Sequence, residues 1–458
     1  MKIEINKIYA AIAVFMIVFY SSFAGYLGVK VDATLLYIWY AAAVLFAFIS
    51  NISELKYRYV KGFPADLIVW IVFSLFVLVS YKMNMMGSTR IFFGIMLCVA
   101  LKNRTSWIKP ALKIIALLTG ASVFFTLFFF IFPQFYTFVI DAYGFVPTGT
   151  SVGKAGYRAG ISDHYSQNGI YISIAILLFA TIFITINSCK EGNGLKEKRI
   201  NKFVIVNFVI SFIALLLTGK RGVLVFSLIS IVSVYLIISK KKVDRAMKIA
   251  IFLLIAVGLL QILSETVPAI GYVFERFQSL GEDDSTLERL AMWDLAIKKF
   301  KKAPLLGNGL WSYRFFYKQE LGAYFHPYEE KYQYLNAHNV YLQLLCETGI
   351  IGFGLYMASI SLTLYKTIKN AKRIMLLDEY YLRYAVIFSL VFQLFYIIYS
   401  FTGNCLYDVV FPFYAIAIAM NMSVDGYLRT YGLWICRCRC GSFCARLRAS
   451  SLDSYCRR

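Results

Sequence analysis

Long apolar stretches alternate with short charged or turn-rich segments along the chain as far as residue 422. An α-helix needs about 20 mostly apolar residues to cross the hydrocarbon core of a bilayer. Twelve stretches approach this length, the fourth being short for a complete crossing: 8–29, 33–50, 64–82, 90–101, 110–132, 167–187, 203–219, 222–239, 247–264, 341–366, 382–402 and 404–422. The pattern therefore predicts an all-α integral membrane protein with about twelve transmembrane helices.

Composition supports the same class of protein, because hydrophobic residues make up 60% of the chain and charged residues only 16%. A surface in contact with water needs more polar residues than this, so we expect no soluble domain. The first stretch carries Ser21, Ser22 and Gly25 and lacks a small-residue cleavage site. We interpret it as a retained helix rather than a signal peptide that is removed.

The distribution of lysine and arginine predicts the orientation, since short cytoplasmic loops retain positive charge. Every second loop is basic: 56–61, 102–109, 190–202, 240–245 and 369–373. We expect these loops and both termini on the cytoplasmic side, and two long segments, about 133–166 and 265–340, on the other face. The chain then divides into transmembrane helices 1–9 (1–264), a large extracytoplasmic loop containing amphipathic helices (265–340), helices 10–12 (341–425) and a cytoplasmic tail (426–458).

A net charge of +22 is also found in proteins that bind nucleic acid. Much of this charge comes from the basic loops and the tail, so we expect no nucleic-acid partner. From Tyr427 onward the tail contains seven arginines, no lysine and five of the nine cysteines. A zinc site at Cys436, Cys438, Cys440 and Cys444 is the alternative, but alternating cysteines leave little chain to wrap around a tetrahedral ion. We interpret the tail as a dispensable extension.

The two outer segments contain all three histidines of the chain, His164, His326 and His338. Polar residues at membrane boundaries are the first candidates for function. The tight turn between the seventh and eighth stretches adds Lys220 and Arg221 on the same face, without an acidic neighbour. One interpretation is that both side chains extend to the lipid headgroups and anchor the helix end. The other, which we favour, is anion binding, because two close cations with guanidinium donors suit a diphosphate.

The second outer segment is expected to form an amphipathic helix on the membrane surface, starting near Ser285, which makes a capping-box pattern with Glu288. Arg289 lies near the start of this helix, where the helix dipole disfavours a cation. The position indicates a bound anion, and the alternative is a solvated charge paired with Glu288 or Asp284. The glycine-rich turn at 305–311 is interpreted as structural.

His338 stands at the start of the tenth stretch, followed by Asn339. At a helix N-terminus the pKa of an imidazole falls, so the neutral ring is free to accept a proton from a hydroxyl. A lone histidine is often structural. The basic residues on the same face favour a general base, and His338 is therefore the catalytic candidate.

The run from Leu287 to Gly352 resembles the signature region of the O-antigen ligase and polymerase superfamily. The shared features are a basic residue followed by an aromatic, the turn Pro-Leu-Leu-Gly-x-Gly at 304–309, the helix start His-Asn-x-x-Leu at 338–342 and Glu-x-Gly-Ile-Ile-Gly at 347–352. The turn Thr-x-x-Arg-Gly at 218–222 is similar to the arginine turn of that superfamily. Together with the expected helices, the likeness covers most of residues 1–425.

This resemblance implies a GT-C-like glycosyltransferase in the bacterial inner membrane, with an extracytoplasmic active face and no cofactor. The donor would be a glycan on undecaprenyl diphosphate. The acceptor is a lipid A core hydroxyl in ligases, the end sugar of a second lipid-linked glycan in polymerases, and a protein serine in related enzymes. By the same resemblance, Arg221 and Arg289 match the diphosphate-binding arginines, His338 matches the candidate base, and Arg158 resembles a further basic position.

The chemical properties of the candidate side chains agree with this expectation. Fixed cations neutralise the charge that grows on a departing diphosphate, so no metal is required. The acidic run Glu282, Asp283 and Asp284 has no further ligands nearby to complete a coordination shell. His338 would deprotonate the acceptor hydroxyl, which attacks the anomeric carbon in line and inverts it.

A transporter or flippase of lipid-linked sugars is the alternative class, because it would also have many helices and membrane-facing arginines. Transporters show inverted repeats and sites near the bilayer midplane. The sequence shows no internal symmetry, and its basic residues and histidines cluster on one face, which favours a transferase. Ligase and polymerase both stay open. A ligase-like enzyme is placed first on the spacing from Arg221 through Arg289 to His338.

Overall fold

The computed structural model describes residues 5–23, 33–52, 64–80, 85–102, 104–143, 156–162, 164–188, 194–238, 271, 284–322, 324–326, 331–333, 335–375, 379–408 and 410–439. Within these ranges the chain is almost entirely helical. The apolar helices are α1 (Ile5–Phe23), α2 (Ala33–Ile52), α3 (Ala65–Val79), α4 (Met85–Leu101), α5 (Ile108–Ile131), α7 (Tyr165–Ser188), α8 (Gly194–Leu217), α9 (Arg221–Ile238), α14 (Val340–Ile374), α15 (Tyr380–Tyr399) and α16 (Val410–Arg439).

By length and composition, five described helices could cross a membrane: α5, α7, α9, α14 and α15. Shorter apolar helical stretches occur in α1, α2, α3, α4 and α8. The expected class, an almost all-helical membrane protein, is confirmed. The number twelve and the GT-C-like arrangement stay predictions, and the expected stretch 247–264 lies outside the described residues.

Two helix boundaries differ from the hydropathy pattern near the C-terminus. The last stretch was expected from 404, but α16 begins at Val410, and residues 400–408 form a turn. Cys405, Leu406 and Tyr407 in this turn are buried, so the turn is as apolar as a helix and the pattern hides it. At its other end α16 runs on to Arg439, beyond the expected start of the tail.

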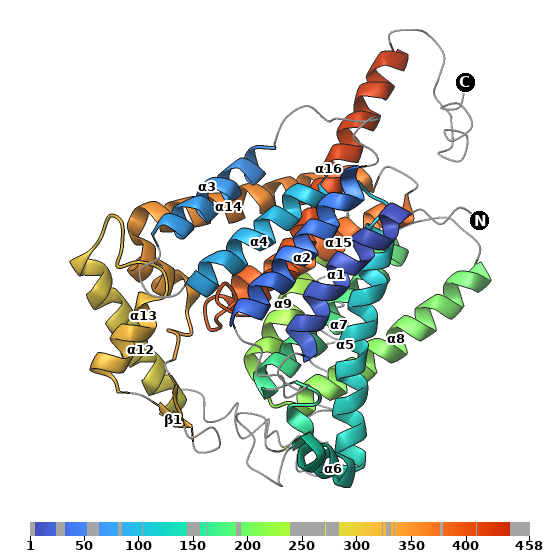
Figure 1. Cartoon of the computed structure of the whole chain (residues 1–458). Coiled ribbons are helices and arrows are strands. Elements are labelled where there is room, and N and C mark those ends of the chain that lie inside the picture. The colour runs from blue at the N-terminus through green and yellow to red at the C-terminus, as the bar shows by residue number, and fades with distance from the viewer. Residues whose placement is uncertain are drawn as a thin grey trace.

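The segments 133–166 and 265–340 add shorter elements, namely α6 (Pro133–Tyr143), the 3-10 turn η1 (Gly156–Arg158), α12 (Asp284–Lys302), α13 (Ser312–Glu320) and the strands β1 (Tyr324–His326) and β2 (Lys331–Gln333). The two strands pair antiparallel, with Phe325 opposite Tyr332. Figure 1 shows α12 and α13 together at one end of the helix bundle and the end of α16 projecting from the opposite end. The helix expected near Ser285 is α12, which begins one residue earlier.

Buried aromatic rings form the core where α3, α14, α15 and α16 meet. Tyr396 stacks on Tyr414 at 4.1 Å between ring centroids, and its hydroxyl lies 3.2 Å from that of Tyr356. Trp70 packs edge-on against Tyr356 at 6.0 Å. All four side chains are fully buried, and aromatic pairs of this kind contribute beyond the area that they bury.

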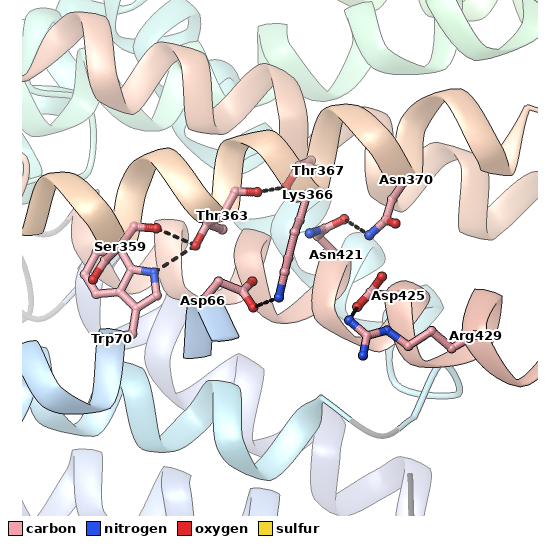
Figure 2. Close-up of polar contacts among 10 residues, drawn as sticks. All are labelled: Asp66, Trp70, Ser359, Thr363, Lys366, Thr367, Asn370, Asn421, Asp425 and Arg429. Atoms are coloured by element: carbon pink, nitrogen blue, oxygen red, sulfur yellow. Dashed lines mark hydrogen bonds and ion pairs between the residues drawn. The ribbon is translucent and has the colours of Figure 1, made fainter. Parts of the chain in front are cut away.

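Polar contacts continue this packing toward the C-terminal end of α14 (Figure 2). The indole of Trp70 donates to Thr363 over 3.0 Å, and Asp66, whose side chain is 1% exposed, forms an ion pair with Lys366. A charge buried away from water needs such a partner. These contacts fix α3 against α14 at the end of α14 remote from α12.

Helix α14 is interrupted at Gly349, whose φ of 62° and ψ of −169° are not helical. A break exposes backbone groups that a continuous helix would pair, and the turn 304–309 pairs them here. Gly309 N–H donates to Glu347 O at 2.8 Å and Ile350 N–H donates to Pro304 O at 2.9 Å. The expected glycine turn is therefore the segment that fills the break in α14.

Gly307→Ala and Gly349→Ala should each destabilise the protein. A Cβ on Gly349 would lie 2.3 Å from the carbonyl oxygen of Leu305, and one on Gly307 would lie 2.4 Å from that of Glu347. Both glycines also have positive φ, which adds roughly 1–3 kcal/mol of backbone strain for other residues. We expect a lower melting temperature of the purified protein in detergent.

Gly354→Ala is the matched control, because it lies on the same helix and an added Cβ would meet nothing within 4 Å. Its melting temperature should equal that of the wild type. A Gly349→Ala protein as stable as this control would mean that the turn does not lock the break.

Candidate functional site

His338 lies immediately before the first turn of α14 and has a positive φ of 50°. The side chain of Asn339 caps the helix, accepting from the N–H groups of Tyr341 and Leu342 at 3.1 Å each. Asparagine is a favoured N-cap because its carbonyl pairs these otherwise unpaired donors. The cap and the strained backbone together fix where His338 leaves the helix.

The peptide before His338 is held from two sides. Ala337 N–H donates to Oε1 of Gln343 at 2.9 Å, and Ala337 O accepts from the indole of Trp293 at 3.0 Å. Trp293 lies one helical turn beyond Arg289 on α12. The position of Arg289 is therefore tied to that of His338 through a buried peptide group.

The charges around His338 lower its pKa. Burial is the largest cause, followed by the positive charges of Arg289 and Lys220, and together they bring the pKa to about 4. The ring is consequently neutral near pH 7. Lys220 and Arg289 come from segments far apart in the sequence, and the fold brings both close enough to act on the same imidazole.

Lys220 and Arg221 occupy the tight turn from α8 to α9, where Gly219 has a φ of 70°. The ammonium of Lys220 lies 4.0 Å from the centroid of the Tyr165 ring, at the start of α7. Such a cation–π contact orients the lysine without neutralising its charge. Arg221 is the first residue of α9 and is half-buried.

Arg158 lies in η1 and, like Lys220, contacts a residue in the first turn of α7. Its carbonyl oxygen accepts from the side-chain amide of Asn168 at 2.8 Å, and the same amide donates to Thr126. Asn168 and Tyr165 are in the first turn of α7, so Arg158 and Lys220 share one end of that helix. Arg158 is not among the groups that shift the pKa of His338.

The other two histidines have different surroundings. Nδ1 of His164 accepts from Ser166 N–H at 2.9 Å, and its ring stacks on Tyr165 at 4.7 Å, so it supports the start of α7. His326 lies in β1, opposite Lys331.

Among the described residues, no group of three His, Cys, Asp or Glu side chains could hold a metal. Glu282 and Asp283 of the acidic run, and Cys440 and Cys444 of the tail, lie outside the described residues.

Two polar residues near the start of α14 were not predicted to be functional from the sequence. Asn404, in the turn between α15 and α16, places its Nδ2 3.4 Å from Nδ1 of the histidine. Glu347 is 0% exposed and accepts from Tyr313 N–H at 3.3 Å and from the Tyr407 hydroxyl at 2.8 Å. A glutamate inside an apolar helix was the available signal for Glu347, whereas nothing in the sequence marks Asn404.

A second pair of cations, also unexpected from the sequence, adjoins the same turn. Nη1 of Arg90 donates to Tyr407 O at 3.4 Å, and the guanidinium of Arg314 lies 5.0 Å from the centroid of the Trp311 ring. Burial lowers the pKa of Arg314, an effect that the charges of Glu347 and Asp408 oppose. Arg90, from α4, and Arg314, from α13, therefore lie near Tyr407 in the turn that carries Asn404.

These groups suit one kind of chemistry. Lys220 and Arg289 can bind an anion beside a neutral imidazole, which can accept a proton. The anion and the proton donor would meet at the end of the bundle where α7, α12 and α14 begin.

Comparison with known proteins agrees with the motifs. A family model described as O-antigen ligase matches residues 206–357, a range that contains Arg221, Arg289 and His338 and leaves Arg158 outside. No curated protein matches the chain. This segment is similar to the O-antigen ligase family, as its motifs indicated.

Proposed function

We propose that this protein is an O-antigen ligase-like glycosyltransferase, which moves a glycan from undecaprenyl diphosphate to an acceptor hydroxyl on the outer face of the inner membrane. The observation that carries the proposal is the action of Lys220 and Arg289 on the ring of His338. A diphosphate bound to these two cations would lie beside the base. The family match supports the reaction class.

In this mechanism Arg221, Arg289 and Lys220 hold the diphosphate, with Arg158 as a further contact. Cleavage of the glycosyl bond leaves more negative charge on the diphosphate, and cations that are already in place stabilise that charge without reorganisation. The reaction then needs no metal ion. Guanidinium groups also bind phosphate oxygens in pairs, which fixes the orientation of the leaving group.

His338 acts on the acceptor. It takes the proton of the acceptor hydroxyl as the oxygen forms its bond to the anomeric carbon and the bond from that carbon to the diphosphate oxygen breaks. In-line displacement inverts the anomeric centre. A lipid A core hydroxyl is the acceptor that we place first, and the end sugar of a second lipid-linked glycan, as in a polymerase, is the alternative within the superfamily.

The proposal includes the orientation derived from the basic loops. The loop 265–340 faces the extracytoplasmic side, and transmembrane helices 1–9 and 10–12 flank it as residues 1–264 and 341–425. The tail from 426 is cytoplasmic and dispensable for transfer. A site at one end of α7, α12 and α14, rather than midway along them, supports a transferase over a transporter of lipid-linked sugars.

Arg221→Ala and Arg289→Ala should each reduce transfer by on the order of 10²-fold, because a fixed charge that stabilises the leaving group is lost. Lysine at either position should rescue transfer only partly, since an ammonium keeps the charge but not the planar donors. The assay measures glycan transfer by purified enzyme in EDTA, so that no divalent ion supplies the missing charge. Wild-type transfer in both alanine variants would remove the arginines from the donor site.

His338→Ala should lower turnover by roughly 10²–10⁴-fold, the range for a positioned general base, while binding of undecaprenyl diphosphate persists. Turnover is measured with both substrates saturating, and binding is measured separately with the lipid diphosphate alone. His164→Ala is the control, since it removes an imidazole at the neighbouring helix end. Undiminished turnover of a folded His338→Ala enzyme at neutral pH would rule out the base.

The pKa of His338 should respond to the cations beside it. Because a nearby positive charge disfavours the imidazolium, Lys220→Ala or Arg289→Ala should raise this pKa above about 4. Diphosphate bound at these cations should raise it too. Protonation of the base lowers activity as the pH falls, so the acid limb of kcat should lie at higher pH than that of kcat/KM. Histidine-selective NMR titration measures the pKa directly.

Lys298→Ala is the control for that titration. Lys298 lies on the exposed side of α12, paired with Asp294 at 2.6 Å, and is not among the groups that shift the pKa of His338. A shift as large as that from Lys220→Ala would show that the effect is not local.

A further inference from the structure

Asn404 is the side chain placed against the ring of His338. Its Nδ2 lies 3.4 Å from Nδ1 of the histidine, while its Oδ1 is buried and has no hydrogen-bond partner among the described residues. Nδ1 of a neutral histidine either accepts a hydrogen bond or donates one, depending on the tautomer. Turning the amide by half a rotation exchanges the two atoms, so that Oδ1 accepts a hydrogen bond from Nδ1–H.

The two orientations of the amide select different tautomers of the neutral imidazole. If the Asn404 amide donates, Nδ1 uses its lone pair in that bond and Nε2 carries the proton, so neither nitrogen is free to accept another. If Oδ1 accepts instead, Nδ1 carries the proton and Nε2 keeps its lone pair. Only the second arrangement leaves a base.

The turn that carries Asn404 is held by the same residues that hold the histidine. Tyr407 N–H donates to Asn404 O at 2.8 Å, and the Tyr407 hydroxyl donates to Oε2 of Glu347 at 2.8 Å. The other oxygen of Glu347 accepts from Gln343 Nε2 at 3.1 Å. Gln343 in turn accepts from Ala337 N–H, next to His338. One buried carboxylate thus links the asparagine and the histidine.

We propose that Asn404 is a positioning residue for His338, its amide oxygen accepting from Nδ1–H and leaving Nε2 to take the proton of the acceptor hydroxyl, and that Glu347 holds the two side chains together. The inference rests on the proposed function, in which His338 is the base. During transfer the hydroxyl proton moves to Nε2, the oxygen keeps the electron pair for its new bond to the anomeric carbon, and the imidazolium retains its Nδ1–H bond to Asn404.

The tautomer of His338 can be observed without any substrate. The chain contains three histidines, so a protein labelled with ¹⁵N in histidine gives few ring signals, and the spectrum of His338→Gln assigns the one of interest. We expect the Nδ1–H tautomer at neutral pH in the wild type. The Nε2–H tautomer would overturn the proposal.

Asn404→Asp tests the contact through the pKa of His338. A carboxylate on Nδ1–H stabilises the imidazolium, so this pKa should rise by about 1–3 pH units, with Arg289 and Lys220 unchanged as the other charged groups that act on the ring. An unchanged pKa would mean that residue 404 does not bond to the histidine.

Kinetics separate positioning from binding. Asn404→Ala should lower kcat about tenfold or more, a part of the roughly 10²–10⁴-fold that a positioned base contributes, with the KM for the lipid-linked donor unchanged. Asn404→Asp should restore part of kcat and move its acid limb to higher pH. Tyr407→Phe, which removes the bond to Glu347, should act in the direction of Asn404→Ala but more weakly. A donor KM that rises while kcat stays constant would overturn the proposal.

Asn370→Ala is the matched control, because it also removes a buried asparagine, from the far part of α14. Its amide donates to Asn421 at 3.0 Å, as Figure 2 shows. It should lower stability while leaving the tautomer and the pH profile of kcat as in the wild type; the same change in both variants would overturn a specific role for Asn404. A wild-type protein that shows the expected tautomer but transfers no glycan would count against the proposed function and leave the Asn404 contact standing.

Discussion

The fit between the turn 304–309 and the break in α14 is the contact on which the end of the bundle around His338 depends. It joins α12, and with it Arg289, to the helix that begins beside His338. Neither glycine at the contact tolerates a side chain, because Gly307 and Gly349 each face the backbone of the other segment. Backbone hydrogen bonds across the break then fix the register of the two segments. The proposed site is built from distant parts of the chain and would need this kind of rigid junction, since small displacements between catalytic groups reduce the rate steeply.

The protein arranges its charged side chains differently at the two ends of α14. Toward its C-terminal end, Asp66 and Lys366 form a pair, which is the usual way to keep ionised groups away from water. At its start, the charges that act on His338 are both positive, from Arg289 and Lys220. Positive charges that act on the same place favour the binding of an anion there. The first arrangement holds helices together, and the second prepares for a ligand.

The sequence predicted those features that depend on composition over many residues. Apolar stretches located the helices, and α12 begins within a residue of its expected start at Ser285. The break at Gly349 was not predicted, because Ile350 and Ile351 continue the apolar pattern without interruption. The turn at 400–408 was hidden for the same reason, since it is buried and contains few polar residues. Asn404 lies in that turn, and a side chain whose neighbours are set by tertiary packing carries no signal in the linear pattern.

Because tertiary packing leaves no signal in the linear pattern, the sequence identified the candidate residues but not how they lie relative to one another. Arginine and histidine are conspicuous in a membrane protein because they are rare within apolar stretches. The resemblance to a family motif then indicates which of these residues are candidates for the site. What decides the behaviour of His338 is which atoms surround its ring, and these come from α12, the turn after α8 and the turn after α15. Burial and two cations make the ring a weak base, and a bound diphosphate would offset the cations. Since binding and protonation are linked, the same coupling that makes the diphosphate raise the pKa of the histidine makes protonation of the histidine favour the diphosphate. In the proposed mechanism, such a base would become stronger when the donor is bound, so an acceptor hydroxyl that arrives first would meet an imidazole with little tendency to take its proton.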